Sequence, residues 1–343
     1  MTVNLKGRNF ITTQDWSREE LEYLIELAFA LKRDPFNSSL ANKTLFMIFF
    51  SPSLRTRSSF DVAMSQLGGH SVVLQVGGGM VWDLEVEEGV VMEGKAAEHI
   101  KDAARVISRY GDAVAIRKFP DMIDWSEEKK DKIINGFARW GDIPVINMES
   151  HLYHPCQAMA DMMTIKEHLG DQEGKNFVLT WAYHPKPLPM SVGDSAVLTA
   201  SKFGMNLTIA HPKGYDLDED IMRVVRENTE ENGSSLTITD DMDEAFHGAD
   251  IIYAKSWGAL SFYNRWEEEK AIREKLRDWR VTQRRMNLTN HGEFMHCLPV
   301  RRNIVVDDEV LDGPDCIAYD EAENRLHIQK AILRAILGTE IGK

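Results

Sequence analysis

Short apolar runs alternate with longer amphipathic stretches along the chain, and this alternation is the feature that most constrains the fold. In the first half the apolar runs read as strands at 44–50, 70–75, 112–117 and 143–148. The amphipathic stretches read as helices at 17–34, 57–68, 96–111 and 127–141. Strands that alternate with helices predict parallel sheets joined by helical crossovers.

The same pattern continues after a helix predicted at 154–170. Strands are expected at 175–183, 205–212, 235–240, 250–256, 293–299 and 316–320, followed by a last helix at 322–338. Because 343 residues exceed one ordinary core, the chain should form two domains. We therefore predict an α/β fold of two doubly wound parallel-sheet domains, 1–152 and 153–320, with an active-site cleft between them. The segment 321–343 is expected to pack back on the first domain.

Charge and cysteine usage narrow the functional classes. A net charge of −14 disfavours nucleic acid or an anionic membrane as a partner, so a small anionic substrate would need a local basic pocket. Cys156, Cys297 and Cys316 are odd in number and widely spaced, which is typical of a reducing cytosol. Without a metal motif, a signal core or an apolar span, we expect a soluble cytoplasmic protein that uses no metal or cofactor.

The stretch "SPSLRTR" (51–57) follows the first strand and opens a helix. Backbone N–H groups at a helix start favour an anion, and Ser53, Arg55 and Thr56 add donors around it. Arginine grips a phosphate through two parallel hydrogen bonds, which lysine does not reproduce. A helix cap with solvated arginines is equally compatible with this spacing.

Two other stretches stand at strand ends. In "HPCQ" (154–157), His154 and Gln157 face one side of a first helical turn, where an imidazole can donate to a developing oxyanion; simple capping is the alternative. In "HCLP" (296–299), proline stops the strand and leaves carbonyl groups free to accept from an amine. Cys297 by itself reads as a small buried hydrophobe, with no base to make it a nucleophile.

Three single residues are more ambiguous. Arg117 and Lys255 close predicted strands, where each is either a ligand-binding cation or a surface charge. Trp82 lies in a glycine-rich stretch, where it either packs or serves as a lid.

The motifs "SPSLRTR", "HPCQ" and "HCLP", in this order, resemble the aspartate/ornithine carbamoyltransferase family over essentially the whole chain. The stretches "WAYHPKPLP", "YAKSWGAL", "CLPVRRN" and "DEAENRLHIQKAI" look like the branch that acts on Nα-acylated ornithine. That branch implies a knotted C-terminal domain and a homotrimer with shared active sites.

The resemblance also implies roles for individual residues. Those that would bind carbamoyl phosphate are Ser53, Leu54, Arg55, Thr56, Arg117, His154, Gln157 and, reaching in from a neighbouring subunit, Trp82. Those that would meet the acyl-ornithine are Glu149, Lys255, Cys297, Leu298, Arg302, Arg325 and Ala97. Arg117, His154, Gln157 and Cys297 are the expected catalytic set, acting through positioning and electrostatic stabilisation.

The sequence gives conflicting indications of which acyl group the ornithine substrate carries. Three features favour N-succinyl-L-ornithine as the substrate: Ala97, Pro189 and the stretch "RRNIVV". The resemblance implies a glutamate at the position of Ala97 in acetylornithine enzymes, and alanine there would remove its repulsion of a second carboxylate. The stretches "KSWGALSF" and "DEAENRLHIQKAI" lean towards acetyl. We expect transfer from carbamoyl phosphate to N-acetyl-L-ornithine, giving N-acetyl-L-citrulline and phosphate in arginine biosynthesis. N-succinyl-L-ornithine is the main alternative; ornithine itself or a non-catalytic binding homologue are weaker ones.

Overall fold

A computed structural model describes residues 4–76 and 83–338, so Trp82 lies outside the described residues. The chain divides into two compact units. The first unit comprises Met1–Asp121, Ser126–Cys156 and Arg325–Lys343, and the second comprises Met122–Trp125 and Gln157–Asn324. Two helices, α6 (Pro155–Leu169) and α13 (Ala318–Leu337), contribute residues to both units.

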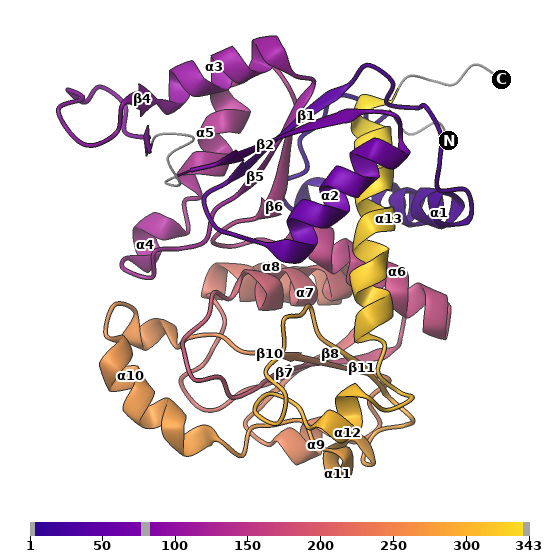
Figure 1. Cartoon of the computed structure of the whole chain (residues 1–343). Helices are drawn as coiled ribbons and strands as arrows, with labels where there is room; N and C mark the ends of the chain where they lie inside the picture. Colours follow the sequence, from indigo (N-terminus) through magenta and orange to yellow (C-terminus); the bar gives the residue numbers. More distant parts are fainter. Residues whose placement is uncertain (1–3, 77–82, 339–343) are drawn as a thin grey trace. The chain divides into compact units, whose positions relative to one another are not determined.

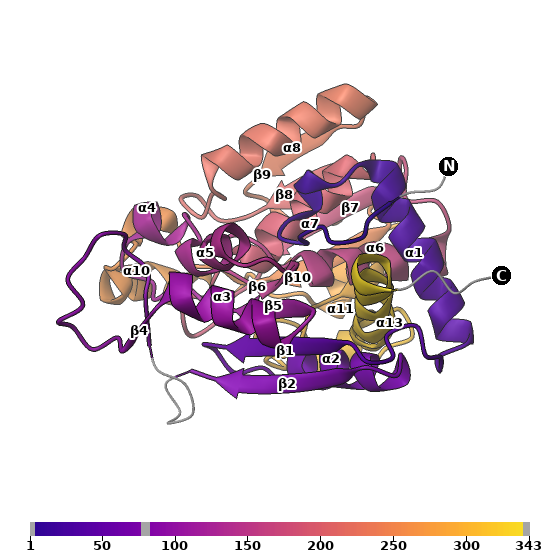
Figure 2. The same cartoon turned by 90° about the horizontal axis from the view of Figure 1, so that it is seen from above.

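The first unit contains a four-stranded parallel sheet in the order β2-β1-β5-β6 (Figure 1). Its strands are β1 (Thr44–Phe49), β2 (His70–Gln75), β5 (Ala113–Arg117) and β6 (Val145–Glu149). Its other elements are η1 (Thr13–Asp15), α1 (Arg18–Arg33), α2 (Leu54–Gln66), α3 (Ile100–Tyr110), α5 (Lys132–Trp140) and the short pair β3 (Leu84–Glu85) and β4 (Glu98–His99). Helices α3 and α5 lie side by side (Figure 2).

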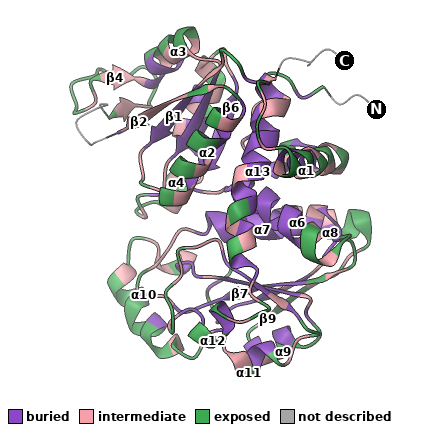
Figure 3. Cartoon of the chain, turned by 45° about the vertical axis from the view of Figure 1, so that its right-hand side comes forward, coloured by how far each residue is buried: buried purple, intermediate pink, exposed green. Residues whose placement is uncertain are grey.

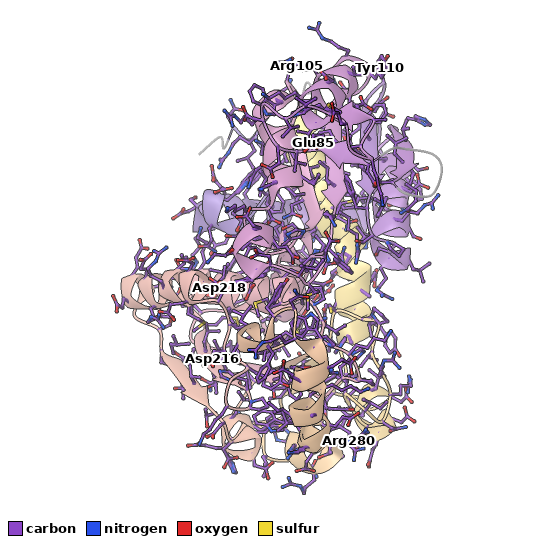
Figure 4. All side chains as sticks on the ribbon, turned by 90° about the vertical axis from the view of Figure 1, so that its left-hand side faces the viewer. Glu85, Arg105, Tyr110, Asp216, Asp218 and Arg280 are labelled. Carbon is purple, nitrogen blue, oxygen red and sulfur yellow. The ribbon has the colours of Figure 1, made fainter. Side chains whose placement is uncertain are left out.

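Local sequence explains where these elements begin and which side they bury. Ser17 and Glu20 form a reciprocal capping box at the start of α1. Strands β1 and β6 are buried along nearly their whole length, whereas β2 at the sheet edge is only partly buried (Figure 3). The exposed face of α3 carries Arg105 and Tyr110 (Figure 4).

The strand order of the first sheet reverses direction between β1 and β5. From β1 the chain moves to the edge strand β2, and after β5 it moves the opposite way to β6. In sheets wound in both directions, ligands bind beyond the carboxyl ends of the strands at this reversal. The predicted phosphate motif follows β1, and Arg117 ends β5, so both stand at that point.

The second unit contains a five-stranded parallel sheet in the order β11-β10-β7-β8-β9. Its strands are β7 (Asn176–Trp181), β8 (Asn206–Ala210), β9 (Leu236–Thr239), β10 (Ile251–Lys255) and β11 (Glu293–Met295). Its own helices are α7 (Ser191–Lys202), α8 (Glu219–Asn232), α9 (Met242–Phe246), η2 (Leu260–Phe262), α10 (Trp266–Arg273), η3 (Glu274–Leu276), α11 (Gln283–Met286) and α12 (Asp308–Leu311). The order reverses between β7 and β10. The predicted α/β fold with parallel sheets is therefore confirmed in both units.

The loop that follows β7 is contacted by chain segments from much later in the sequence. Tyr183 N donates to Trp279 O at 2.7 Å, and Gly258 N donates to Leu188 O at 3.0 Å. A Cβ atom on Gly258 would lie 2.9 Å from the Cβ of Pro187, so only glycine fits this approach. The knot that the resemblance implies for this region stays a prediction.

Two expected elements are wrong. Residues 316–320 are not a strand: Cys316 makes one isolated bridge with Phe294, and α13 begins at Ala318. The helix expected at 127–141 is two helices, α4 (Trp125–Glu128) and α5. Asp131 separates them because its backbone is left-handed, with φ 46°.

Candidate active site

The first motif residue, Ser53, caps helix α2. Its hydroxyl accepts a hydrogen bond from Thr56 N at 3.2 Å, and its backbone is extended, as capping requires. Leu54 is 76% exposed, Arg55 is half-buried, and Thr56 is buried. Arg57 is exposed. The helix start thus presents backbone N–H groups together with Arg55, whereas Arg57 lies on the solvent side.

A buried polar cluster of Arg117, Glu149 and His154 lies at the carboxyl ends of β5 and β6. The pairing of β5 with β6 shifts register after Ile116, so Arg117 lies opposite Glu149. Irregular pairing of this kind re-aims side chains near active sites. Arg117 Nη2 contacts Glu149 Oε2 at 2.9 Å, and His154 Nε2 lies 3.5 Å from the same oxygen. All three side chains are less than 10% exposed.

Arg325 joins this part of the first unit from helix α13. Its Nη2 donates to Thr56 Oγ1 at 3.0 Å, and the side chain is buried. One of its hydrogen bonds is thus to a residue of the predicted phosphate motif, and the contact of Arg325 with the acyl-ornithine stays a prediction.

Cys156, between His154 and Gln157 in the sequence, is no nucleophile. Burial raises the pKa of its thiol to about 12, and Sγ donates to Asn147 O. It therefore stays protonated at neutral pH, as expected of a structural cysteine.

In the second unit, Gln157 lies in a buried polar network. Its Nε2 donates to Asp161 Oδ1 at 2.8 Å and to Glu321 Oε1 at 2.6 Å. Burial, followed by the neighbouring Asp161, raises the pKa of Glu321 well above its usual range. Burial and a neighbouring carboxyl group both favour the neutral form of Glu321.

The "HCLP" motif follows β11 in an unusual backbone conformation. Leu298 has φ 51°, in the left-handed region that leucine rarely adopts. Its N–H donates to His296 Nδ1 at 2.8 Å. Cys297 and Leu298 are half-buried. Rare backbone conformations cluster at functional sites, which suits a carbonyl group with a positioning role.

Cationic side chains gather where the second sheet reverses. Lys255 ends β10 and is half-buried. His184 follows β7, and its Nε2 accepts from Arg301 Nε at 2.9 Å. Burial lowers the pKa of His184, and the charges of Arg301 and Lys255 lower it further. The charges of Arg301 and Lys255 near this imidazole suit the binding of a carboxylate.

Two predicted acyl-ornithine residues lie at exposed positions. Arg302 forms ion pairs with Asp308 at 2.8 Å and Asp312 at 2.7 Å. Ala97 precedes strand β4.

Within residues 4–76 and 83–338, histidine, cysteine and acidic side chains nowhere gather into a group able to hold a metal ion. In the same part of the chain, every helix is too short or too polar to cross a membrane.

Comparison with known proteins identifies the architecture. The family model for the carbamoyl-P binding domain of aspartate/ornithine carbamoyltransferase matches residues 8–167, and the model for the Asp/Orn binding domain matches residues 189–336. An N-acetylornithine carbamoyltransferase of Xanthomonas campestris pv. campestris is 48% identical and covers 96% of this chain and 98% of its own length. The chain belongs to the aspartate/ornithine carbamoyltransferase family.

Two further comparisons refine its place among carbamoyltransferases. A solved acetylornithine transcarbamylase complexed with acetylcitrulline superposes with a TM-score of 0.95 at 48% identity, covering 97% of this chain and all of that one. An N-succinylornithine carbamoyltransferase of Bacteroides thetaiotaomicron is 37% identical over 96% of this chain and 98% of its own length. The predicted family and enzyme class are confirmed.

Four residues that the structure brings to these clusters are not predicted from the sequence. His184, Arg301 and Glu321 lie in stretches that serve only to mark the branch, and Asp161 lies within a predicted helix. Asp161 is four residues from Gln157, a spacing that places both on one helix face and that would have predicted their contact.

Proposed function

We propose that this carbamoyltransferase moves the carbamoyl group of carbamoyl phosphate to the δ-amine of N-acetyl-L-ornithine in arginine biosynthesis, in the cytoplasm. The observation that carries the proposal is the buried cluster of Arg117, Glu149 and His154, in a chain 48% identical to an enzyme named for this substrate. Arg117 ends β5, the strand that pairs with β1, and α2 follows β1.

In this proposal the first unit binds carbamoyl phosphate. The phosphate meets the backbone N–H groups at the start of α2 with the side chains of Ser53, Arg55 and Thr56. Arg325 belongs to the same group, because its hydrogen bond fixes the Thr56 hydroxyl. Trp82 of a neighbouring subunit is proposed as a further contact of carbamoyl phosphate. Arg117 and His154 polarise the carbamoyl oxygen, and Gln157, which belongs to the second unit, accepts from the carbamoyl amide.

The reaction follows from these positions. The neutral δ-amine attacks the carbamoyl carbon, and the carbonyl π-electrons move to oxygen, giving a tetrahedral oxyanion. Arg117 and His154 stabilise that charge as it develops. The oxyanion collapses, the C–O bond to phosphate breaks with its electron pair, and the proton lost by the amine ends on the departing phosphate, which leaves as hydrogen phosphate.

The second unit supplies the acceptor contacts in the same proposal. Leu298 O accepts from the δ-amine, with Cys297 beside it. Lys255, His184 and Arg301 bind the α-carboxylate, since they bring cations and an imidazole to the point where the sheet reverses. Glu149, Arg302 and Arg325 stay proposed contacts of the acyl-ornithine.

Succinyl-ornithine is a second candidate because of Ala97. The resemblance places glutamate here in acetylornithine enzymes, whereas alanine leaves room and no repelling charge for a second carboxylate. Ala97→Glu should lower the rate with succinyl-ornithine relative to acetyl-ornithine. An unchanged ratio would remove Ala97 as the discriminating residue.

A ureido colorimetric assay with carbamoyl phosphate tests the main proposal. Ornithine, N-acetyl-L-ornithine and N-succinyl-L-ornithine are compared at equal concentrations, and acetylornithine is expected to give the highest kcat/KM. A higher value with succinylornithine would favour the second candidate, a preference for free ornithine would contradict the branch, and no product with any acceptor would overturn the activity.

We also propose a homotrimer in which Trp82 serves the site of a neighbouring subunit. Light scattering should give three times the chain mass. Trp82→Ala and Arg117→Ala proteins, each nearly inactive, should regain activity when mixed and reassembled, because some sites then receive an intact residue of each kind. Absence of recovery in confirmed mixed trimers would refute the shared site.

A further inference from the structure

Glu321 is a buried carboxyl group that joins separate segments of the second unit. It lies in the first turn of α13 and is fully buried. Oε1 accepts from Gln157 Nε2 at 2.6 Å and from Tyr253 OH at 3.4 Å, while Oε2 accepts from His296 N at 2.9 Å. One side chain therefore connects α6, β10 and the segment after β11.

The contacts of Gln157 determine which end of its amide faces the carboxyl groups. A primary amide has two N–H donors, and Nε2 uses them on Asp161 and Glu321. The reversed orientation would turn the amide oxygen towards two carboxyl groups, where only a protonated Glu321 could donate to it, so two hydrogen bonds would be exchanged for one at most. The carboxyl pair therefore directs Oε1 away from itself, and this oxygen is the atom that accepts hydrogen bonds.

The other oxygen of Glu321, Oε2, accepts a hydrogen bond from the "HCLP" segment. His296 N donates to Glu321, and His296 Nδ1 accepts from Leu298 N at 2.8 Å. These two bonds form a short relay from the carboxyl group to the left-handed Leu298. The relay holds a conformation that leucine does not adopt readily by itself.

The raised pKa of Glu321 is consistent with a role in positioning Gln157 and Leu298. Burial and the neighbouring Asp161 raise the pKa of Glu321. A protonated Glu321 adds no second negative charge beside Asp161, and its oxygens still accept from neutral donors.

We propose that Glu321, with Asp161, is a positioning residue that fixes the Gln157 amide and the Cys297–Leu298 backbone together. The inference rests on the proposed function, in which Gln157 accepts from the carbamoyl amide and Leu298 O accepts from the attacking amine. Glu321 then coordinates the two reacting partners without touching either.

A double-mutant cycle tests this assignment in the whole enzyme. Glu321→Ala should lower kcat by about 100-fold, since misplacement of positioning groups by about 1 Å costs this much. KM for carbamoyl phosphate should change little. In a Gln157→Ala background the same substitution should cost far less, because groups that act as a unit are non-additive. Fully multiplicative losses would overturn the proposal.

Two further variants serve as controls. Glu321→Gln retains one acceptor oxygen and should give an intermediate rate; it carries the test if Glu321→Ala does not fold. Asn324→Ser alters the next turn of α13, where Asn324 bonds Thr164 and Glu167 of α6. It should leave kcat near wild type. A loss equal to that of Glu321→Gln would show that general packing of the two helices, not positioning, sets the rate.

A measurement that does not depend on catalysis distinguishes a failure of this inference from a failure of the proposed function. Hydrogen exchange of the Gln157 side-chain amide, assigned in ¹⁵N NMR spectra by its loss in Gln157→Ala, should be slow in the wild type. It should become at least ten times faster in Glu321→Gln and stay slow in Asn324→Ser. Unchanged exchange in Glu321→Gln overturns the positioning role, whereas absence of carbamoyl transfer by the wild type overturns the activity instead.

Discussion

In the first unit, two nitrogen-bearing side chains approach one buried carboxylate, whereas in the second unit two buried carboxyl groups flank one amide. Arg117 and His154 both approach Glu149, and the Arg117 guanidinium forms an ion pair with it. Asp161 and Glu321 both accept from the amide of Gln157, and burial raises the pKa of Glu321. The first cluster balances a buried charge with an opposite charge, and the second one favours the neutral form of a carboxyl group.

The largest change in stability is expected when the buried ion pair of Arg117 and Glu149 is broken. Arg117→Met should destabilise the protein by about 3–5 kcal/mol, because it leaves Glu149 buried without its guanidinium partner. Urea unfolding, followed by circular dichroism, measures the change. The double variant Arg117→Met/Glu149→Gln should recover most of the loss. A single-variant loss below about 1 kcal/mol would mean that pairing does not govern this cluster.

A second prediction concerns Asp194 in the first turn of α7. Both carboxyl oxygens are buried without a hydrogen-bond partner among the described residues. Burial, and then the charge of Asp218, labelled in Figure 4, raises the pKa of Asp194 well above its usual range. The folded state therefore binds an extra proton above about pH 4, and stability falls as the pH rises.

Asp194→Asn should consequently stabilise the protein at pH 8, on the order of 2 kcal/mol, and have little effect near pH 4. Unfolding midpoints across this pH range provide the measurement. Asp216→Asn, at a largely exposed carboxylate, is the control and should show no such trend. Equal stabilisation at both pH values would exclude proton uptake at Asp194 as the cause.

Lys330 differs from Arg117, although both are buried in the first unit. The hydrogen bonds of Lys330 go to neutral acceptors and not to a carboxylate. Its Nζ donates to Leu31 O at 3.0 Å, Pro35 O at 2.7 Å and Gln66 Oε1 at 2.9 Å. Burial lowers its pKa to about 8. The folded state thus loses its proton before the unfolded chain does, and stability should rise from about pH 8 to pH 10.5.

Lys330→Met should cost about 1 kcal/mol at pH 7, because three lost hydrogen bonds are partly offset by removal of a buried ammonium group. The loss should widen at pH 10, where only the wild type gains stability. Parallel urea titrations at the two pH values decide this. A loss that shrinks with rising pH would contradict the direction of the pKa shift.

The smallest effect is expected at Arg302. Its ion pairs with Asp308 and Asp312 are exposed, and such pairs are screened by salt. Arg302→Ala should leave the unfolding midpoint almost unchanged in 0.5 M NaCl. If Arg302 also binds the acyl-ornithine, KM for that substrate should rise while stability does not. An unchanged KM would remove Arg302 from the proposed contacts.

Local motifs explain why the first cluster was predictable. Ser53, Arg117 and His154 each stand at a strand end or helix start, and such positions are visible in short stretches of sequence. The strands predicted there agree with the structure within about two residues. Parallel strands bring their carboxyl ends to one edge, so the residues could be placed near one another without the structure.

Long-range partners explain what was not predictable. Gln157 and Glu321 are 164 residues apart, and Thr56 and Arg325 are 269 apart, so neither contact has a local signature. The apolar residues of 316–320 resembled a buried strand, but the segment enters helix α13 at Ala318. The short apolar run fits both elements, and only tertiary packing distinguishes them.

The passage of α13 from one unit to the other has a consequence for synthesis on the ribosome. Residues 325–337 of this helix supply Arg325 to Thr56 and Lys330 to the ends of α1 and α2. The ribosome makes them after Gln157–Asn324 is complete. The part of the protein that is translated first is therefore finished last, and until then Thr56 and the ends of α1 and α2 lack their buried partners, which leaves incompletely packed surface open to aggregation or to a chaperone.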